Sequence, residues 1–156
     1  MTEREQIRKS IKSQLNSYRD LRAEHRQLTE ELQRLEILMR APSSTNFDGM
    51  PRDGSGVSNP VERMVIKHVE LEERYKQKVA DLVDSQIVIE NMIEDLEPTE
   101  RRLARFRYID GLTWEDVCVK ISYSWMQTHR IHGRMLDKLV DAEMERRADN
   151  EQKKAD

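Results

Sequence analysis

The chain has 156 residues, of which 37% are charged, and its formal net charge at pH 7 is −3. A mean hydropathy of −0.86 is too polar for one compact core of this length, so long solvated helices are expected. The acidic balance argues against a general nucleic-acid coat protein. The single cysteine, Cys118, excludes an intrachain disulfide, and no apolar run is long enough to span a membrane. We therefore expect a cytoplasmic protein without a membrane segment.

Residues 1–40 are predicted to form one long helix. Apolar side chains recur there with alternating steps of four and three, and the residues between them are nearly all charged or polar. This spacing is typical of a coiled-coil seam. The helix should end before Pro42, which blocks its continuation. The predicted seam runs through Ile7, Ile11, Gln14, Tyr18, Leu21, His25, Leu28, Leu32, Leu35 and Met39.

Residues 59–95 are predicted to form a second helix of similar length. Asn59 can cap its start, Pro60 suits the first helical position, and Glu62 completes a capping box. Equal lengths favour an antiparallel coiled-coil hairpin, although the sequence leaves open whether the helices pair within one chain or between two. The second seam runs through Val61, Met64, His68, Leu71, Tyr75, Lys78, Leu82, Ser85, Ile89, Met92 and Leu96.

Residues 41–58 connect the two long helices. They are rich in glycine, serine and proline, which is turn and linker chemistry. A connection of this length is either a flexible linker, the interpretation adopted here, or a docking element. In the second case its anchors would be Phe47, Met50 and Arg52.

Residues 96–147 carry signals for three further helices in close succession. Pro98 opens the first, and Gly111 follows it as a residue suited to the left-handed conformation past a helix end. Thr113 begins a capping box for the second helix, and Ser124 can cap the third. A short helix, a three-residue turn and a longer helix describe a helix-turn-helix. The second helix of such a pair normally enters the major groove of DNA.

The stretch from 96 to 139 resembles the fourth region of sigma-70-type factors, which recognises the −35 promoter element. The shared features are Leu96-Glu-Pro-Thr-Glu-Arg, the pair Arg107-Tyr108, Gly111-Leu-Thr-Trp-Glu-Asp-Val, the cap Ser124, and the closing Leu136 and Leu139. Further motifs extend the resemblance to small sigma-like regulators of phages and mobile elements, related to RinA- and ArpU-type late transcription activators. These motifs are Leu38-Met-Arg-Ala-Pro-Ser, Gly49-Met-Pro-Arg-Asp-Gly-Ser-Gly, Asn59-Pro-Val-Glu and Thr128-His-Arg-Ile-His-Gly.

The predicted third helix has an inward and an outward face. Four residues at helical spacing are expected to face inward: Thr128, Ile131, Met135 and Leu139. The resemblance implies base contacts near the cap and five and six residues beyond it, and side-chain chemistry extends this set. The predicted DNA-contacting residues are Trp125, Met126, Gln127, His129, Arg130 and Arg134. Sigma factors usually carry charged or polar residues where Trp125 and Met126 stand, so protein contact is the alternative for this face.

A second set of residues is predicted to contact phosphates. It consists of Arg101, Arg102, Arg105, Thr113 and Lys138. For the arginine cluster, the alternative is a solvated face balanced by Glu97 and Glu100. His129 and His132 could suggest a metal site together with Cys118, but the spacing of the two histidines fits neither a zinc finger nor a His-x-x-x-His pair. No catalytic constellation is visible, so neither a metal, a cofactor nor an enzymatic activity is expected.

The sequence thus predicts an all-α protein, in which a long antiparallel coiled-coil hairpin precedes a sigma region 4-like helix-turn-helix and residues 148–156 form a disordered tail. Its expected function is sequence-specific binding of promoter DNA to regulate phage or mobile-element genes. Host RNA polymerase is expected as a further partner, and the N-terminal helices are expected to form a homodimer. Two alternatives stay open: a DNA-packaging protein like the small terminase subunit, and an interaction module that binds RNA polymerase without DNA.

Overall fold

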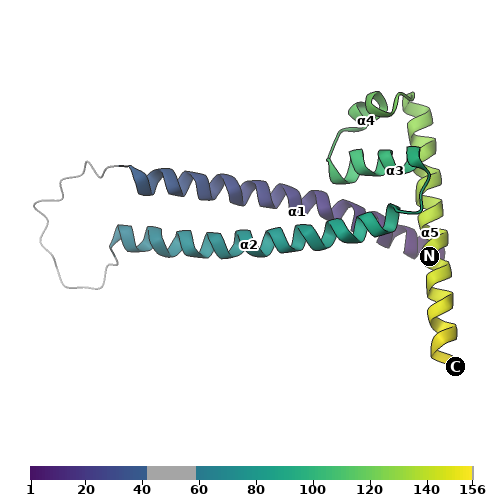
Figure 1. The fold of residues 1–156 in the computed structure, drawn as a ribbon, viewed down its shortest axis with the longest axis horizontal. Helices are drawn as coiled ribbons and strands as arrows, with labels where there is room; N and C mark the ends of the chain where they lie inside the picture. Colours follow the sequence, from purple (N-terminus) through teal and green to yellow (C-terminus); the bar gives the residue numbers. More distant parts are fainter. Residues whose placement is uncertain (42–58, 156) are drawn as a thin grey trace, which may run out of the picture. The chain divides into compact units, whose positions relative to one another are not determined.

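The computed structural model describes residues 1–41 and 59–155, and this part of the chain is all-helical (Figure 1). Its α-helices are α1 (Glu3–Arg40), α2 (Pro60–Ile93), α3 (Pro98–Ala104), α4 (Trp114–Ile121) and α5 (Trp125–Ala155), with a π-helical turn, η1 (Arg105–Ile109), after α3. The all-α class and the antiparallel packing of the two long helices are confirmed. The predicted linker, apart from Ala41, lies outside the described residues. None of the described helices combines the length and apolar character needed to cross a membrane.

The chain divides into two compact units, and both long helices contribute to each. The hairpin unit is Ala23–Ala80, and the core unit joins Met1–Arg22 to Asp81–Asp156. The structure therefore draws its main core from the two ends of the sequence.

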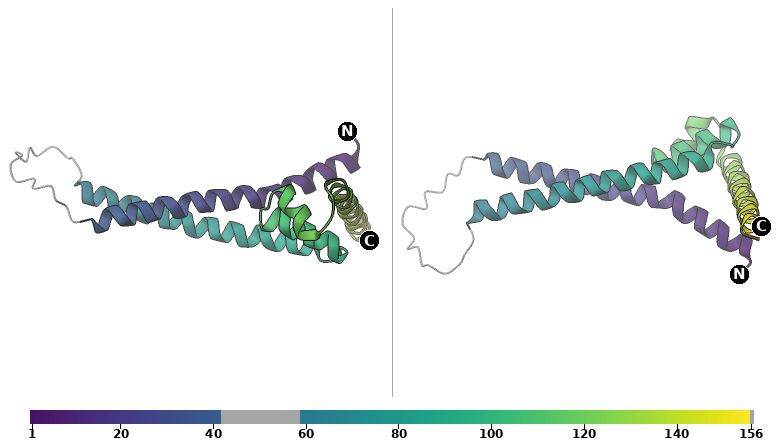
Figure 2. Two further views of the ribbon diagram at one scale, coloured as in Figure 1. Left: turned by 90° about the horizontal axis from the view of Figure 1, so that it is seen from above. Right: turned by 60° about the horizontal axis from the view of Figure 1, so that its bottom comes forward.

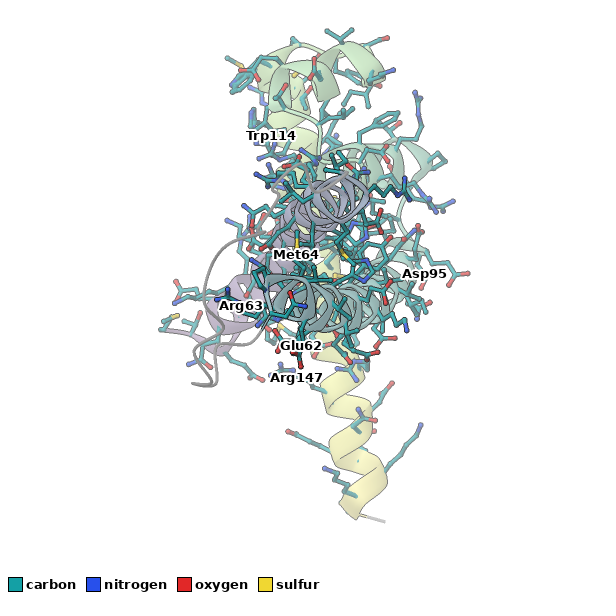
Figure 3. All side chains as sticks on the ribbon, turned by 90° about the vertical axis from the view of Figure 1, so that its left-hand side faces the viewer. Glu62, Arg63, Met64, Asp95, Trp114 and Arg147 are labelled. Carbon is teal, nitrogen blue, oxygen red and sulfur yellow. The ribbon has the colours of Figure 1, made fainter. Side chains whose placement is uncertain are left out.

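The hairpin unit pairs the second half of α1 with the first half of α2. Leu35 and Leu71 are its buried apolar side chains, at 8% and 3% exposure. The rings of His25 and Tyr75 lie 4.9 Å apart between centroids, so a polar seam position is filled by ring packing. In the first turns of α2, Met64 lies toward α1, whereas Glu62 and Arg63 are exposed (Figure 3).

Ion pairs flank this seam and agree with one antiparallel register. Lys78 pairs with Glu24, and Lys67 Nζ lies 3.8 Å from a carboxylate oxygen of Glu31. Glu31 lies further along α1 than Glu24, and its partner Lys67 lies earlier in α2 than Lys78, as antiparallel helices require. These pairs are largely exposed, so each contributes only a few tenths of a kcal/mol, or about 1 kcal/mol at most.

Three positions of the predicted seams differ from the structure. Gln14 is exposed, whereas its neighbour Leu15 is fully buried at 0% exposure. Met39 and Val61, near the open ends of α1 and α2, are exposed at 41% and 62%. The first turns of α1 pair with α5 as well as α2, and the buried face of α1 is displaced there toward Leu15 and away from Gln14.

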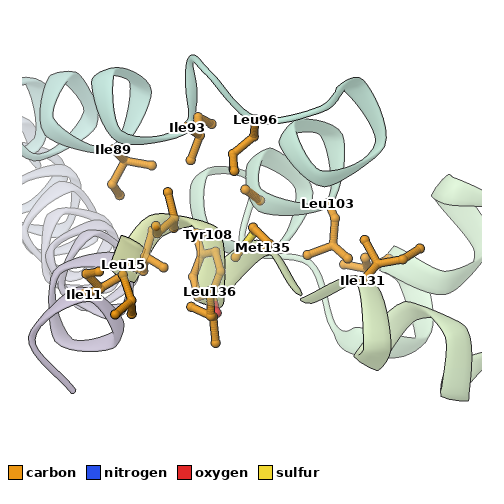
Figure 4. Close-up of a cluster of buried hydrophobic side chains, with 14 of the residues drawn as sticks. Ile11, Leu15, Ile89, Ile93, Leu96, Leu103, Tyr108, Ile131, Met135 and Leu136 are labelled. Carbon is orange, nitrogen blue, oxygen red and sulfur yellow. The ribbon is translucent and has the colours of Figure 1, made fainter. Parts of the chain in front are cut away.

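The core unit buries one apolar cluster contributed by all five helices (Figure 4). Two salt bridges join α1 to α5 beside it, Arg4 with Asp141 and Arg8 with Asp137. Both views of Figure 2 show the first turns of α1 beside α5. The cluster consists of Ile7, Ile11, Leu15, Tyr18, Ile89, Ile93, Leu96, Leu103, Ala104, Tyr108, Val117, Ile121, Ile131, Met135, Leu136, Leu139 and Val140.

The connection between α3 and α4 combines a predicted and an unpredicted feature. Gly111 has φ +72°, which confirms its left-handed conformation past the helix end. The N–H of Leu112 donates to the carbonyl of Phe106 at 2.9 Å across this turn. The π-helical turn was not predicted, and its i→i−5 bond runs from the Asp110 N–H to the Arg105 carbonyl at 2.8 Å.

Helix α5 is longer than the sequence analysis indicates. Residues 148–155, predicted as part of a disordered tail, continue the helix to Ala155. This segment contains no proline or glycine and is rich in alanine, glutamate, glutamine and lysine. These residues have favourable helix propensity, so a helix anchored in the core can extend through them.

Candidate nucleic-acid interface

Two capped helices and a short turn form the framework of the candidate interface. Thr113 caps α4, because its Oγ1 accepts a hydrogen bond from the Asp116 N–H at 3.2 Å and its hydroxyl donates to the Asp116 carboxylate at 3.0 Å. Ser122 ends α4 in the left-handed conformation, with φ 61°. Ser124 Oγ then accepts from the Gln127 N–H at 3.3 Å at the start of α5. The predicted caps Thr113 and Ser124 are confirmed.

The buried face of α5 determines which of its side chains meet solvent. The predicted inward residues are all buried: Thr128, Ile131, Met135 and Leu139, at 0%, 5%, 0% and 4% exposure. Ile131, Met135 and Leu139 belong to the same cluster as Leu103 of α3 and Val117 and Ile121 of α4. Packing on two sides therefore fixes the rotation of α5 about its own axis and leaves one side of its first turns open.

Five of the six predicted DNA-contacting residues lie on this open side, which we call the α5 face: Trp125, Met126, Gln127, Arg130 and Arg134. Trp125 and Met126 are exposed at 52% and 64%. Arg130 Nη2 lies 3.7 Å from the sulfur of Met126, one helical turn away. The face combines two guanidinium groups, an amide and a large apolar area.

The sixth residue, His129, is placed differently. It is half-buried, and its Nε2 is shielded from solvent with no hydrogen-bond partner among the described residues. Its ring lies between two indoles, 4.6 Å from Trp114 and 4.5 Å from Trp125 between centroids. His129 thus sits beneath the α5 face and supports Trp125, instead of offering Nε2 to a base edge.

The rings around His129 form a cluster that the sequence analysis did not anticipate. Trp114, at the first turn of α4 (Figure 3), also contacts His132, with centroids 4.8 Å apart. The guanidinium carbon of Arg107 lies 4.8 Å from the Trp114 ring centre, in cation–π geometry. The only sequence signal for this cluster is that His129 and His132 lie three residues apart, about one helical turn, so that both face α4 and η1.

His132 is held in its neutral form by its surroundings. The hydroxyl of Tyr108 and Nε2 of His132 are hydrogen-bonded, with 2.6 Å between the heavy atoms. The pKa of His132 is lowered from 6.5 to about 4, chiefly by burial. Repulsion between positive charges adds to the shift, in decreasing order from His129, Lys12, Arg107 and Arg8.

Most of the predicted phosphate contacts are already engaged within the protein. Arg101 Nη2 donates to the carbonyls of Glu94 and Leu96 at 2.8 and 2.9 Å, which closes the turn after α2. Arg105 pairs with Glu90. Lys138 Nζ lies 2.9 Å from the carboxylate of Glu100, which is 2% exposed, and 3.4 Å from that of Glu97. Each of these three cations already has a partner within the protein, so each is less available to a phosphate than an unpaired cation.

Two members of the phosphate set remain accessible. Arg102 is exposed, donates one hydrogen bond to the Lys120 carbonyl at 3.2 Å, and retains other N–H donors. Thr113 is exposed and acts as the cap of α4. Tyr123, in the turn before α5, is 41% exposed and was not among the predicted site residues. Its position next to the cap Ser124 was the signal that could have identified it.

A groove borders the α5 face and has mixed charge. Its basic and polar lining comes from Tyr123, Gln127, Arg130 and Arg134, and its acidic lining from Glu97, Glu100 and Asp137. The carboxylates of Glu100 and Asp137 are paired with Lys138 and Arg8. An anion that approaches α5 therefore meets Arg130 and Arg134. The negative charges of the neighbouring Glu100 and Asp137 are already balanced by ion pairs.

Thr128 provides a local test of the packing beneath this face. Its Oγ1 is buried without a hydrogen-bond partner in the described structure. An unsatisfied buried hydroxyl costs about 1–3 kcal/mol. The Thr128→Val change should therefore raise the free energy of unfolding by about 1 kcal/mol, measured by urea denaturation. Thr128→Ser, which keeps the hydroxyl and removes a methyl group, should lower it; a destabilised valine variant would contradict the assignment.

Comparisons with protein-family models, with curated proteins and with solved structures give no match for this chain.

Proposed function

We propose that the protein is a sequence-specific DNA-binding regulator of transcription, with α5 as the helix that enters the major groove. The observation that carries the proposal is the α5 face, an exposed set of base-reading side chains on the first turns of a helix fixed by α4. A helix is about 10–12 Å across, which matches the major groove of about 12 Å. The resemblance to sigma region 4 makes promoter DNA of phage or mobile-element genes the expected ligand.

Each side chain of the α5 face has a distinct chemical role in this proposal. The guanidinium of Arg130 can donate two hydrogen bonds to guanine, and the amide of Gln127 can pair with adenine. Met126 can contact a thymine methyl group. Arg134, two turns into α5, and Arg102, at the end of α3, are the proposed phosphate contacts. Trp125, supported by His129, would pack on the sugar-phosphate backbone.

Binding through one copy should depend only modestly on salt. Arg130, Arg134 and Arg102 are the accessible arginines of the proposed interface, because Arg101, Arg105 and Lys138 are paired internally. Each phosphate neutralised contributes about 0.9 to the slope of log affinity against log salt concentration. The two proposed phosphate contacts, Arg134 and Arg102, therefore predict a slope of about −2, which can be measured by titrations at several salt concentrations.

The Arg130→Ala change tests the proposed base contact. Loss of a bidentate arginine–guanine pair should weaken specific binding by about 1–3 kcal/mol and relax one base position. The target is first selected from a pool of random duplexes by the unmodified protein, and affinity is then measured by fluorescence anisotropy. Arg146→Ala, an exposed arginine near the other end of α5, is the matched control and should bind like the unmodified protein.

Two results would count against the proposal. One is a random pool that yields no preferred sequence, and the other is equal affinity of the Arg130→Ala variant and the unmodified protein for the selected duplex. The exposure of Trp125 and Met126 favours RNA polymerase as the second candidate ligand, because aromatic and methionine side chains are enriched at protein interfaces. In that case Trp125→Ala would abolish polymerase capture while no DNA sequence is selected.

A further inference from the structure

Helix α2 carries a second apolar stripe, separate from the seam that faces α1. Its apolar members are exposed at 37–62%, and we call them the valine stripe: Val61, Val65, Val69, Val79, Val83 and Ile87. Glu72 and Lys76 lie between them, and the steps along the stripe are four, four, three, four, three, four and four residues. These steps keep all eight positions on one face of a helix. The seam residues Leu71 and Ile89 are buried on another face.

The stripe has the same pattern from either end. Arg74 is at the midpoint of the stripe along the helix. Positions equally far before and after it carry matching or complementary side chains: Glu72 with Lys76, Val69 with Val79, Val65 with Val83, and Val61 with Ile87. Interfaces with two-fold symmetry require this property, because residue i of one copy contacts residue j of the other and j contacts i. The stripe is therefore complementary to itself when two copies are antiparallel.

We propose that α2 of one chain pairs antiparallel with α2 of a second copy through the valine stripe. Each end of the pair would bury aliphatic side chains, and Glu72 of each copy would face the ammonium group of Lys76 in the other. In a parallel pair, Glu72 would face Glu72 and Lys76 would face Lys76, which is repulsive. Charge complementarity thus favours the antiparallel arrangement. This inference does not depend on the proposed DNA binding.

The two central charges are available for such pairing. Glu72 and Lys76 side chains are 50% and 72% exposed, and each makes a long ion-pair contact within its own helix. Glu72 lies 3.8 Å from His68 Nδ1, and Lys76 Nζ lies 3.7 Å from Glu73. Exposed contacts of this length contribute little, so exchanging them for pairs across the two-fold axis costs little.

The size of the stripe sets the expected strength of the dimer. At 1.5 Å per residue it is about 39 Å long, and a helix is roughly 10 Å wide, so each copy presents roughly 400 Å². This is about half of the area per partner in a standard stable interface. We therefore expect a monomer–dimer equilibrium in the micromolar range, which DNA or another partner that holds two copies together would shift toward the dimer.

Sedimentation equilibrium of the full chain over a micromolar concentration series tests the proposal. The mass should rise from 18.5 kDa, that of one chain, toward twice this value. Val65→Glu should weaken association by roughly tenfold or more, since it places an unpaired carboxylate in the stripe. Ile66→Glu is the matched control, because Ile66 is similarly exposed, at 52% against 46% for Val65, but lies off the stripe. An unchanged monomer at every concentration, or equal effects of both variants, would overturn the proposal.

Charge exchange gives a test that leaves the apolar stripe intact. Glu72→Lys and Lys76→Glu should each weaken self-association, because like charges then meet across the two-fold axis. The double variant restores opposite charges and should dimerise like the unmodified protein. Mixing the two single variants should produce mixed dimers in preference to dimers of either one. Additive weakening in the double variant would exclude the antiparallel register.

Disulfide trapping determines the orientation of the pair. In a Cys118→Ser background, Val65→Cys and Val83→Cys single variants should crosslink to each other on mild oxidation but not to themselves. Antiparallel pairing places position 65 of one copy beside position 83 of the other. Self-crosslinking of either variant alone would indicate parallel pairing and contradict the proposal.

Discussion

Replacing Leu15 with alanine is expected to lower the free energy of unfolding by about 2–5 kcal/mol. Leu15 is completely buried in the core unit, in the cluster that also contains Ile89 and Leu136. Its removal leaves a cavity where α1 meets the other helices, and the surrounding side chains come from segments that cannot all move to fill it. Urea denaturation followed by circular dichroism measures the change.

The adjacent Gln14→Ala variant is the control for this prediction. Gln14 is exposed, so its truncation should change the free energy of unfolding by no more than about 0.5 kcal/mol. The pair of variants distinguishes two registers of α1, because the regular heptad predicted from the sequence places Gln14 on the buried side. A larger effect at Gln14 than at Leu15 would show that the first half of α1 follows that heptad.

Acidification should destabilise the protein through His132. The pKa of this histidine is about 4 in the folded protein and near 6.5 in an unfolded chain. Between these values the unfolded state binds a proton that the folded state does not, so unfolding is favoured as the pH falls. The contribution of His132 is complete above about pH 6.5 and is lost progressively toward pH 4. The loss can reach about 3 kcal/mol.

The His132→Gln variant isolates this contribution. Glutamine does not titrate, and its side-chain amide can replace the imidazole in the hydrogen bond with the Tyr108 hydroxyl, which is 2.6 Å from His132 Nε2 in the unmodified protein. Carboxylates also titrate in this range, so the informative quantity is the difference between the two proteins. Urea denaturation at pH 7.5 and 4.5 should show a smaller loss of stability in the variant. Equal losses would mean that protonated His132 is tolerated in the fold.

Local signals in the sequence predict the elements of this fold well. Pro98, Gly111, Thr113 and Ser124 each act through backbone geometry or capping bonds within a few residues, so their effects do not depend on the tertiary structure. The inward residues of α5 follow from helical periodicity for the same reason. The burial of Leu15 could not be predicted in this way, because it depends on α5, which lies more than a hundred residues further along the chain.

The candidate interface shows a similar division. Exposure of Arg130 follows from its position relative to Ile131 and Met135, all within two helical turns. The internal contacts of Arg101 and Arg105 could not be predicted from sequence spacing. Arg101 binds the carbonyl of Leu96 and Arg105 binds the carboxylate of Glu90, both on the preceding segment of chain. The sequence shows that an arginine is present, but only the three-dimensional structure shows whether its guanidinium group is already bound to a carboxylate or a carbonyl.

The core unit joins segments from both ends of the sequence, and this affects how the protein folds during synthesis on the ribosome. Ile7, Ile11 and Leu15 emerge early, yet they are buried by segments of the second half of the chain, and the Arg4–Asp141 pair spans most of the sequence. At about 5–20 residues per second, the first turns of α1 wait on the order of 6–25 s for these partners. The hairpin unit needs far less chain and can close sooner. We therefore expect folding to start in the middle of the sequence and to finish when its two ends meet, with an apolar helix exposed to chaperones in the interval.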